Sequence, residues 1–158
     1  MRLPARVELP DGTVLAIREL HASDEPTLRA WFASLSNQSR YQRFHGHVGD
    51  LSDAHWRYLT RIDGVDHTAI VATHENRFVA IARMIRLEGG AAEIAFLVGD
   101  DQQRRRIGSL LRDVLISIAQ ARAYSRLLAF VLPNNVAIRK LLGDFTDKGN
   151  VLELELAS

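Results

Sequence analysis

Apolar residues recur along this chain at two spacings, one typical of helices and the other of strands. The first helical stretch follows Ser23, which stands in an N-cap position with acidic residues and Pro26 in the next turn. Its apolar face is formed by Leu28, Trp31, Phe32 and Leu35. Ser52 stands in the same position before a second helix, whose apolar face is formed by Trp56, Leu59 and Ile62. The polar residues 36–50 between them follow neither spacing and stay unassigned.

The most regular helical pattern lies in the second half of the chain. Its apolar residues follow the i, i+3, i+4, i+7, i+8, i+11 series of a single helix face. They are Ile107, Leu110, Leu111, Val114, Leu115 and Ile118. A shorter helix is predicted from about Asn135 to Leu142, after Pro133, which ends the preceding strand.

Six short runs rich in β-branched and other apolar residues predict strands. They are Thr13–Leu20, Thr68–Thr73, Phe78–Leu87, Ala92–Val98, Arg126–Leu132 and Val151–Leu156. The second, third and fourth runs are joined by tight turns, which favours an antiparallel meander. In the last run leucines alternate with Glu153 and Glu155, so one face of this strand should be exposed to solvent. The strand could also lie at an edge of the sheet and pair with a second copy in a homodimer. The element order predicts one α/β (α+β) domain over residues 1–158, with about six strands and about four helices.

Composition narrows the functional classes. The chain has 158 residues, 47% of them hydrophobic, which is enough for a core without metals or cross-links. It has no cysteine, which excludes disulfides, cysteine-ligated zinc and a thiol nucleophile, and favours a reducing, cytoplasmic location. No apolar run approaches the roughly 20 residues that cross a bilayer. The net charge of +1 gives no general attraction to nucleic acid, so we expect neither a membrane nor a nucleic acid as partner.

Glu93 is the one ionisable residue in the Ala91–Val98 run, and strand alternation places it on the same face as Ala95 and Leu97. A carboxyl group that is buried in apolar surroundings has a raised pKa, which suits it to accept a proton near neutrality. The alternative is a glutamate at the exposed beginning of a strand. The strand by itself leaves both interpretations open.

Residues 100–109 lead from this strand into the most regular helix. A helix start exposes unpaired backbone N–H groups and the positive end of the dipole, so it can hold a phosphate. Gly108 would allow a ligand to approach closely, Ser109 could add a hydroxyl, and Arg104–Arg106 could bind phosphate oxygens. Asp100 and Asp101 would help to begin the helix. The alternative is a solvated basic loop, and the same arginines keep open a weaker nucleic-acid role.

Glu93 in Ala92–Phe96, followed by Gln103–Gly108, resembles motif A of the GNAT superfamily of N-acetyltransferases, in which a strand glutamate precedes a Gln/Arg-x-x-Gly-x-Gly/Ala loop. Asn134–Arg139 resembles the N-x-x-A segment of that family. Residues 36–44 and Ile62-Asp63 are similar to the catalytic domain of bacterial protein lysine acetyltransferases of the Pat type. The resemblance spans about Thr13–Leu142 and implies a three-layer fold with a mixed, mostly antiparallel central sheet.

The resemblance also implies an activity and a set of site residues. The activity is transfer of an acetyl group from acetyl-CoA, as cosubstrate, to a primary amine that could be a protein lysine, in a ternary complex without a metal. Glu93 would be the general base, and the amide near Val98 could stabilise the oxyanion. The groups that would contact coenzyme A are the main chain of Leu97 and Val98, the loop Gln103, Arg104, Arg105, Arg106, Ile107, Gly108 and Ser109, and Asn134.

The sequence departs from the family pattern at two positions. Arg106 replaces the first glycine of the loop, and Leu141 falls near the tyrosine that many members use as general acid. The alternative to an enzyme is therefore a degenerate GNAT domain that binds CoA or a partner protein. His45 and His47 form an H-x-H pair without a third candidate ligand, so we expect no metal site.

Overall fold

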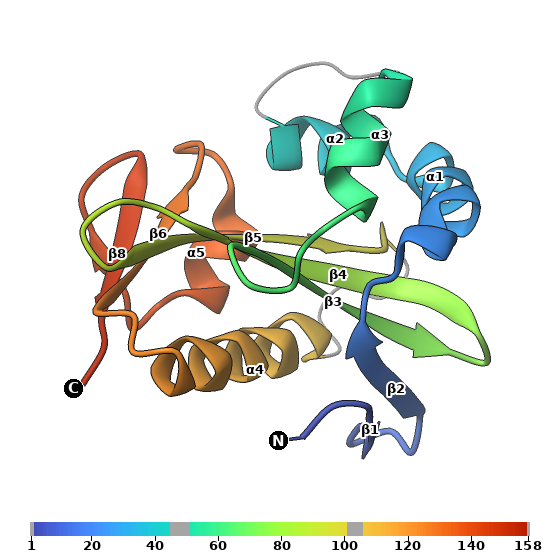
Figure 1. Cartoon of the computed structure of the whole chain (residues 1–158), viewed down its shortest axis with the longest axis horizontal. Helices are drawn as coiled ribbons and strands as arrows, with labels where there is room; N and C mark the ends of the chain where they lie inside the picture. The colour runs from blue at the N-terminus through green and yellow to red at the C-terminus, as the bar shows by residue number, and fades with distance from the viewer. Residues whose placement is uncertain (1, 45–50, 101–105, 158) are drawn as a thin grey trace.

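The computed structural model describes residues 2–44, 51–100 and 106–157, which form an eight-stranded sheet with helices on both faces (Figure 1). The strands are β1 Ala5–Glu8, β2 Val14–Glu19, β3 His67–His74, β4 Arg77–Arg86, β5 Ala91–Val98, β6 Arg126–Phe130, β7 Thr146–Asp147 and β8 Val151–Glu155. Their order in the sheet is β1-β2-β3-β4-β5-β6-β8-β7, and every neighbouring pair is antiparallel except β5 and β6, which are parallel. The α/β class is confirmed, while the sheet has two more strands than expected, the short β1 and β7.

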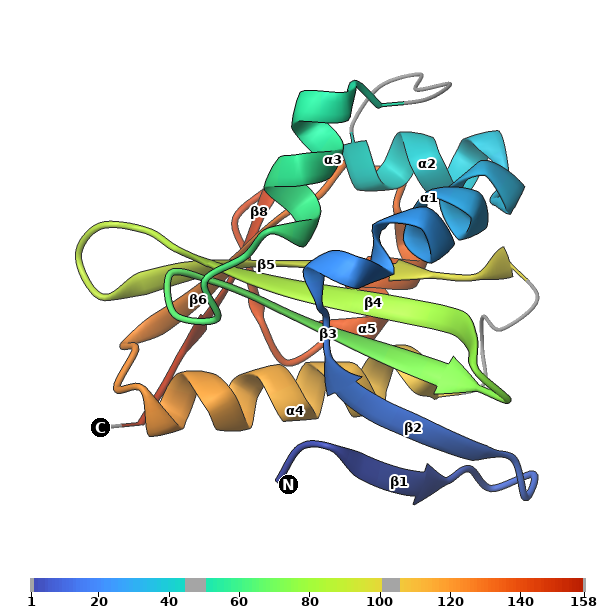
Figure 2. The same ribbon diagram turned by 45° about the vertical axis from the view of Figure 1, so that its right-hand side comes forward.

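Helices form the other two layers. They are η1 Ala22–Asp24, α1 Glu25–Ser34, α2 Asn37–Phe44, α3 Asp53–Thr60, α4 Ile107–Ala121 and α5 Val136–Leu141. α4 lies along one face of the sheet, whereas α1, α2 and α3 lie over β3–β5 on the other (Figure 2). Among the described helices, none combines the length and the apolar character that a membrane span requires.

The core has one part on each face of the sheet. On the α4 side, Leu111 and Leu115 are fully buried among residues of β2, β3, β4, β5 and β6. On the other side, Phe32 of α1 and Trp56 of α3 pack edge to face, with ring centroids 5.4 Å apart, above Val71, Ile81 and other strand residues. β5 thus lies between α2 on one side and α4 on the other.

The two predicted N-caps have different outcomes. The Ser52 side chain accepts a hydrogen bond from the His55 amide at 3.1 Å, which confirms it as the cap of α3. The prediction for Ser23 is wrong, because residues 22–24 form the turn η1 and α1 begins after Asp24. Asp24 is held by Arg18 through two bonds of 2.8 and 2.9 Å and by the His21 amide at 2.8 Å. These bonds hold Asp24 at the junction between η1 and α1.

The prediction that one face of the last strand is exposed to solvent is wrong at Glu153. Glu155 is exposed, but Glu153 is only 8% exposed, because its carboxylate binds Lys148 at 2.5 Å and Arg126 at 3.5 Å. The strand is not an edge either, since β7 pairs with β8 at Thr146 and Asp147. The reason given for pairing between two copies through β8 is therefore lost.

Candidate functional site

The parallel pairing of β5 with β6 stops before either strand ends. Partners run from Ala91 with Arg126 to Glu93 with Leu128, whereas β5 continues to Val98 and β6 to Phe130. Along its other edge, β5 stays in register with β4 as far as Val98. The two strands therefore part beyond Glu93. An extended ligand arm could pair with β5 there as another strand would. This part of β5 contains Leu97 and Val98, whose main chain the family resemblance implies as a ligand contact.

The helix α4 begins beside the same end of β5. A Cβ atom added at Gly108 would lie 3.3 and 3.4 Å from the two Cδ atoms of Leu141 and 3.9 Å from Cγ2 of Val98. The missing side chain therefore lets the first turn of α4 approach both the end of β5 and α5. Ile107 is buried and anchors this turn in the core, while Ser109 is half-buried. Gln103, Arg104 and Arg105 lie outside the described residues.

Glu93 is half-buried at the point where β5 and β6 part. Its partners in register are Ile85 on β4 and Leu128 on β6, so its carboxylate has apolar neighbours on both sides. The face it shares with Leu97 is the one covered by α1–α3, as strand alternation predicts. The interpretation of Glu93 as an exposed residue at the start of a strand is therefore wrong, because Ala91 and Ala92 before it are already buried in the sheet.

Arg43, in the last turn of α2, faces the same part of β5. Burial lowers the pKa of the Arg43 guanidinium, and the nearby charge of Glu93 opposes that effect by raising it. The carboxylate thus lies in the electrostatic field of a cation from a helix that the sequence left unassigned. A half-buried carboxylate thus lies where the edge of β5 diverges from β6, and the start of α4 lies at the Val98 end of the same strand.

Residues 17–143 match the family model described as acetyltransferase (GNAT) family. The chain belongs to the GNAT family. This membership confirms the family expected from Glu93 and the Gln103–Gly108 loop.

Two curated relatives and one solved structure define its place in the GNAT family further. Acetyltransferase Pat of Mycolicibacterium smegmatis is 34% identical over 88% of this chain, which spans 43% of that protein. Acetyltransferase PA5475 of Pseudomonas aeruginosa is 31% identical over 84% of this chain and 74% of its own length. The crystal structure of the GNAT domain of S. lividans PAT has a TM-score of 0.90 at 31% identity and covers 96% of both chains. The chain therefore spans less than half of one relative and nearly all of an isolated GNAT domain.

Arg106, which replaces a glycine of the GNAT loop pattern, has a backbone conformation that favours glycine. Its φ of 64° and ψ of 13° lie in the left-handed region, where a side chain is disfavoured by about 1 kcal/mol and glycine is not. The Arg106 side chain is exposed. An arginine at this position therefore carries backbone strain that a glycine would not.

Replacing Arg106 by glycine should stabilise the domain by about 0.5–1 kcal/mol, because it removes this strain. Arg106→Ala is the matched control, since it also removes the guanidinium but keeps a Cβ at positive φ. Urea unfolding of both variants provides the comparison. Equal stability of the two variants would show that the left-handed conformation carries no cost.

Arg83 and His67 form a buried polar pair beside Glu93, on neighbouring strands. Arg83 Nη1 donates to the Leu59 carbonyl at 2.6 Å and lies 3.1 Å from Nε2 of His67. A guanidinium can only donate, so Nε2 of His67 accepts and its proton sits on Nδ1. Burial, together with the charge of Arg83, lowers the pKa of His67 to about 4. Burial also lowers the pKa of Arg83, to about 9, with a further contribution from Arg43.

The neutral state of His67 predicts a loss of stability in mild acid. The unfolded state binds a proton at His67 below about pH 6.5, whereas the native state resists protonation until about pH 4, so stability falls as pH decreases across this window. The full effect is up to about 3 kcal/mol. Urea unfolding between pH 7.5 and 4.5 measures it, and His67→Gln, which keeps an acceptor for Arg83, should flatten the dependence. An equally steep dependence in that variant would assign the effect to other groups.

Asp100 has a role other than the predicted one. Its carboxylate accepts bonds from the Ser36 amide at 2.7 Å, the Ser36 hydroxyl at 2.8 Å and the Ser39 hydroxyl at 2.5 Å. Burial acts to raise the pKa of Asp100, but these bonds lower it below its usual value. Asp100 therefore fastens the start of α2 to the end of β5, rather than starting α4. Asp101 lies outside the described residues.

Asn134 is followed by Asn135, which is the N-cap of α5. Asn134 is exposed, whereas Asn135 is buried and accepts a bond from the Ile138 amide at 3.2 Å as the N-cap of α5. α5 then holds Leu141 against Gly108. Contact between Asn134 and CoA stays a prediction, and so does the absence of a metal, because His45 and His47 lie outside the described residues.

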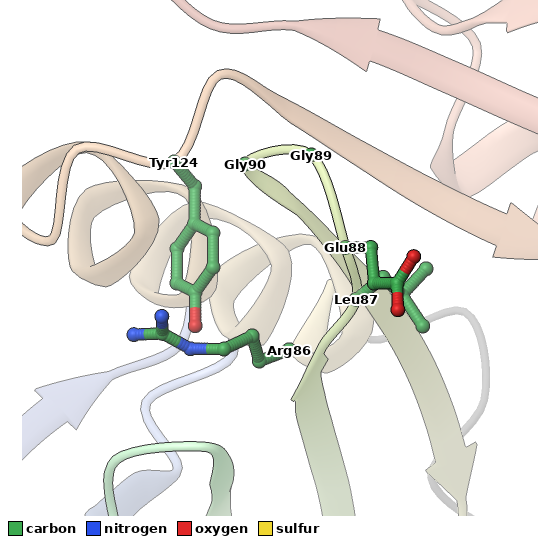
Figure 3. Close-up of a pocket in the computed structure, with 6 residues that line it drawn as sticks. All are labelled: Arg86, Leu87, Glu88, Gly89, Gly90 and Tyr124. Carbon is green, nitrogen blue, oxygen red and sulfur yellow. The ribbon is translucent and has the colours of Figure 1, made fainter.

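A groove in the described structure lies away from this site. It has a volume of about 550 Å³ and is lined by Arg86, Leu87, Glu88, Gly89, Gly90 and Tyr124 (Figure 3). It lies at the opposite end of β5 from Val98, beside the turn between β4 and β5. Arg86 lies over the Tyr124 ring at 5.6 Å and pairs with Asp66 at 2.9 Å. Its charge is therefore already matched within the protein.

Proposed function

We propose that the chain transfers an acetyl group from acetyl-CoA directly to a primary amine, with Glu93 as the general base. The observation that carries this proposal is the position of Glu93, which is the last β5 residue in register with β6. A thioester that lies between the parting strands would be within reach of this carboxylate, directly or through one water.

The carrier would be held by main-chain groups at two places. Amides of Arg104–Ser109, with Gln103 closing the loop, would bind the pyrophosphate, helped by the dipole of α4. The β5 main chain around Leu97 and Val98 would pair with the pantetheine arm, and Asn134 would lie beside the pantetheine or adenosine part. The close packing at Gly108 supports this arrangement, because it brings these two elements together.

The chemistry needs one proton acceptor and one stabilised oxyanion. A lysine-like amine has a reference pKa near 10.4, so it must lose a proton, here to Glu93, before its nitrogen attacks the thioester carbonyl. The amide bond forms as the carbon–sulfur bond breaks. The thiolate leaves with the electron pair, and the second proton of the attacking nitrogen passes to solvent or to that thiolate. The backbone N–H near Val98 would stabilise the oxyanion. The chain has no cysteine, which excludes an acyl-enzyme on a thiol.

The acceptor that we favour is a protein lysine. Support comes from the similarity to the GNAT domain of S. lividans PAT and to M. smegmatis Pat. Among the described helices, α1, α2 and α3 lie over β3–β5, whereas β6 and β8 lie to one side of them (Figure 1). An acceptor could approach Glu93 from there without displacing a helix.

The proposal is tested by incubating the chain with acetyl-CoA and a panel of small amines, lysine peptides and folded proteins. Release of CoA is followed with a thiol reagent, which meets no cysteine in this chain, and acetylation by mass spectrometry. Initial rates that depend on both substrates in a sequential pattern would support a ternary complex. A ping-pong pattern would contradict it.

Leu141 favours the second candidate, a GNAT domain that binds CoA or a protein without catalysis. Leu141 packs against Gly108 with an apolar side chain and cannot donate a proton to a leaving thiolate. Acetyl-CoA would then raise the melting temperature, while none of the acceptors in the panel would be acetylated.

A further inference from the structure

Strands β6 and β8 carry three apolar side chains on the face of Glu93. Leu128 is in register with Glu93, and Phe130 follows it by two positions, so both side chains point to that face. Val151 of β8 is in register with Phe130 and lies beside it. This apolar strip of Leu128, Phe130 and Val151 therefore begins next to the proposed base and continues where β5 and β6 have parted.

The apolar strip is exposed in spite of its composition. Phe130 is 44% exposed, and Leu128 and Val151 are half-buried. The alternate residues of β6, Leu127 and Ala129, are buried on the α4 side, whereas none of the three described strip residues belongs to either part of the core. β6 and β8 lie to one side of α1–α3 (Figure 1). The Phe130 ring therefore presents apolar surface to a molecule that approaches Glu93 from this side.

The charges beside the apolar strip define what it can hold. Glu153 lies on one side of Leu128, in register with it, and its charge is matched by Lys148 and Arg126. Glu93 lies on the other side of Leu128. The strip therefore ends at the carboxylate of the proposed base. A protein lysine is complementary to this arrangement, because its four methylenes can lie along apolar surface while the terminal nitrogen meets a carboxylate.

We propose that Phe130 is a specificity-determining residue, whose ring packs on the aliphatic stem of the acceptor and favours amines with a stem as long as that of lysine. This inference rests on the proposed function, in which the acceptor nitrogen meets Glu93. Leu128 lies one strand spacing of about 4.8 Å from Glu93, and Phe130 lies about 6.6 Å further along β6. A stem of two methylenes ends near Leu128, whereas the four methylenes of lysine extend to the ring.

The experiment varies the length of the acceptor stem. In the lysine peptide that is acetylated fastest, the lysine is replaced by ornithine and by diaminobutyrate, which shorten the stem by one and two methylenes. In the wild type, kcat/KM should fall about two- to fourfold for each methylene removed. Phe130→Ala should lower kcat/KM about tenfold for the lysine peptide and about twofold or less for the diaminobutyrate peptide. Comparing variant and wild type on the same peptide cancels differences in amine basicity.

Two further variants and one binding measurement serve as controls. Val14→Ala removes an equally exposed apolar side chain from β2, which β3, β4 and β5 separate from β6, and should leave kcat/KM unchanged for all three peptides. Phe130→Leu keeps an apolar side chain and should retain most of the dependence on stem length. Calorimetric titration should give the same Kd for acetyl-CoA in Phe130→Ala as in the wild type.

Several results would overturn the role of Phe130. An equal loss of kcat/KM on all three peptides in Phe130→Ala, or an unchanged dependence on stem length, would contradict it. A weaker Kd for acetyl-CoA would assign the ring to the carrier, and a dimer in sedimentation that Phe130→Ala dissociates would assign it to a second copy. Acetylation of other acceptors but of no lysine peptide would overturn this inference alone, whereas acetylation of no acceptor at all would overturn the proposed function, so the two failures are distinguishable.

Discussion

Replacing Glu93 by glutamine should reduce turnover by about 100- to 10,000-fold at pH 7, the range that a positioned general base contributes. Glutamine has almost the same shape but cannot accept the proton of the amine. Acetyl-CoA binding should change little, because the proposed carrier contacts are main-chain groups of other residues. Steady-state rates with the best acceptor, together with acetyl-CoA titration by calorimetry, separate the two effects.

Glu153→Gln is the matched control for this prediction. Glu153 is in register with Leu128, which is in register with Glu93, so the two carboxylates point to the same face with one strand between them. Glu153 is already held by two cations and should not serve as the base. Most activity should therefore remain in Glu153→Gln. A loss as large as that of Glu93→Gln would contradict the assignment of Glu93 as the base.

Replacing Gly108 by valine should abolish the stabilisation that acetyl-CoA gives to the native state. A ligand at 100 times its Kd stabilises by about 2.7 kcal/mol, which corresponds to roughly 5–10 °C in a domain of this size. In the variant, branched methyl groups would add to a Cβ that is already 3.3 Å from Leu141. This overpacking should cost about 1–3 kcal/mol and move the first turn of α4 away from β5.

Gly108→Ala is the control, because the family pattern admits alanine at this position and the flexible end of Leu141 can yield to one methyl group. The alanine variant should keep most of the thermal shift. Thermal unfolding with and without acetyl-CoA measures both variants. A full shift in Gly108→Val would show that the start of α4 does not hold the carrier.

Elements with a local signal could be predicted from the sequence. The face of α4 has a regular 3.6-residue period, Ser52 caps its own helix, and the meander strands lie between turn residues, so neighbours in sequence supply the whole signal. Glu93 and the Gln103–Gly108 loop belong to this class, since strand alternation and family spacing locate both. The sequence could therefore predict the fold class and the proposed base.

Features that depend on distant residues could not be predicted in this way. α2 is polar, and its start is held by Asp100, 64 positions away from Ser36 in the sequence, so no local pattern identifies it. The burial of Glu153 depends on Lys148 across a turn and on Arg126 from another strand. The position of Arg43 likewise depends on the packing of α2 on β5 and has no local signal in the sequence. Asp100 was one available signal for α2, because an acidic residue at the end of a strand can cap the start of a nearby helix.

The most direct test of this account is a crystal structure of the chain with coenzyme A. We expect the diphosphate at the amides that begin α4, the pantetheine arm along β5 beyond Glu93, and the thiol between the parting strands on the side of the Glu93 carboxylate. Coenzyme A bound in the groove between Arg86 and Tyr124, or a thiol that lies out of reach of Glu93, would contradict it.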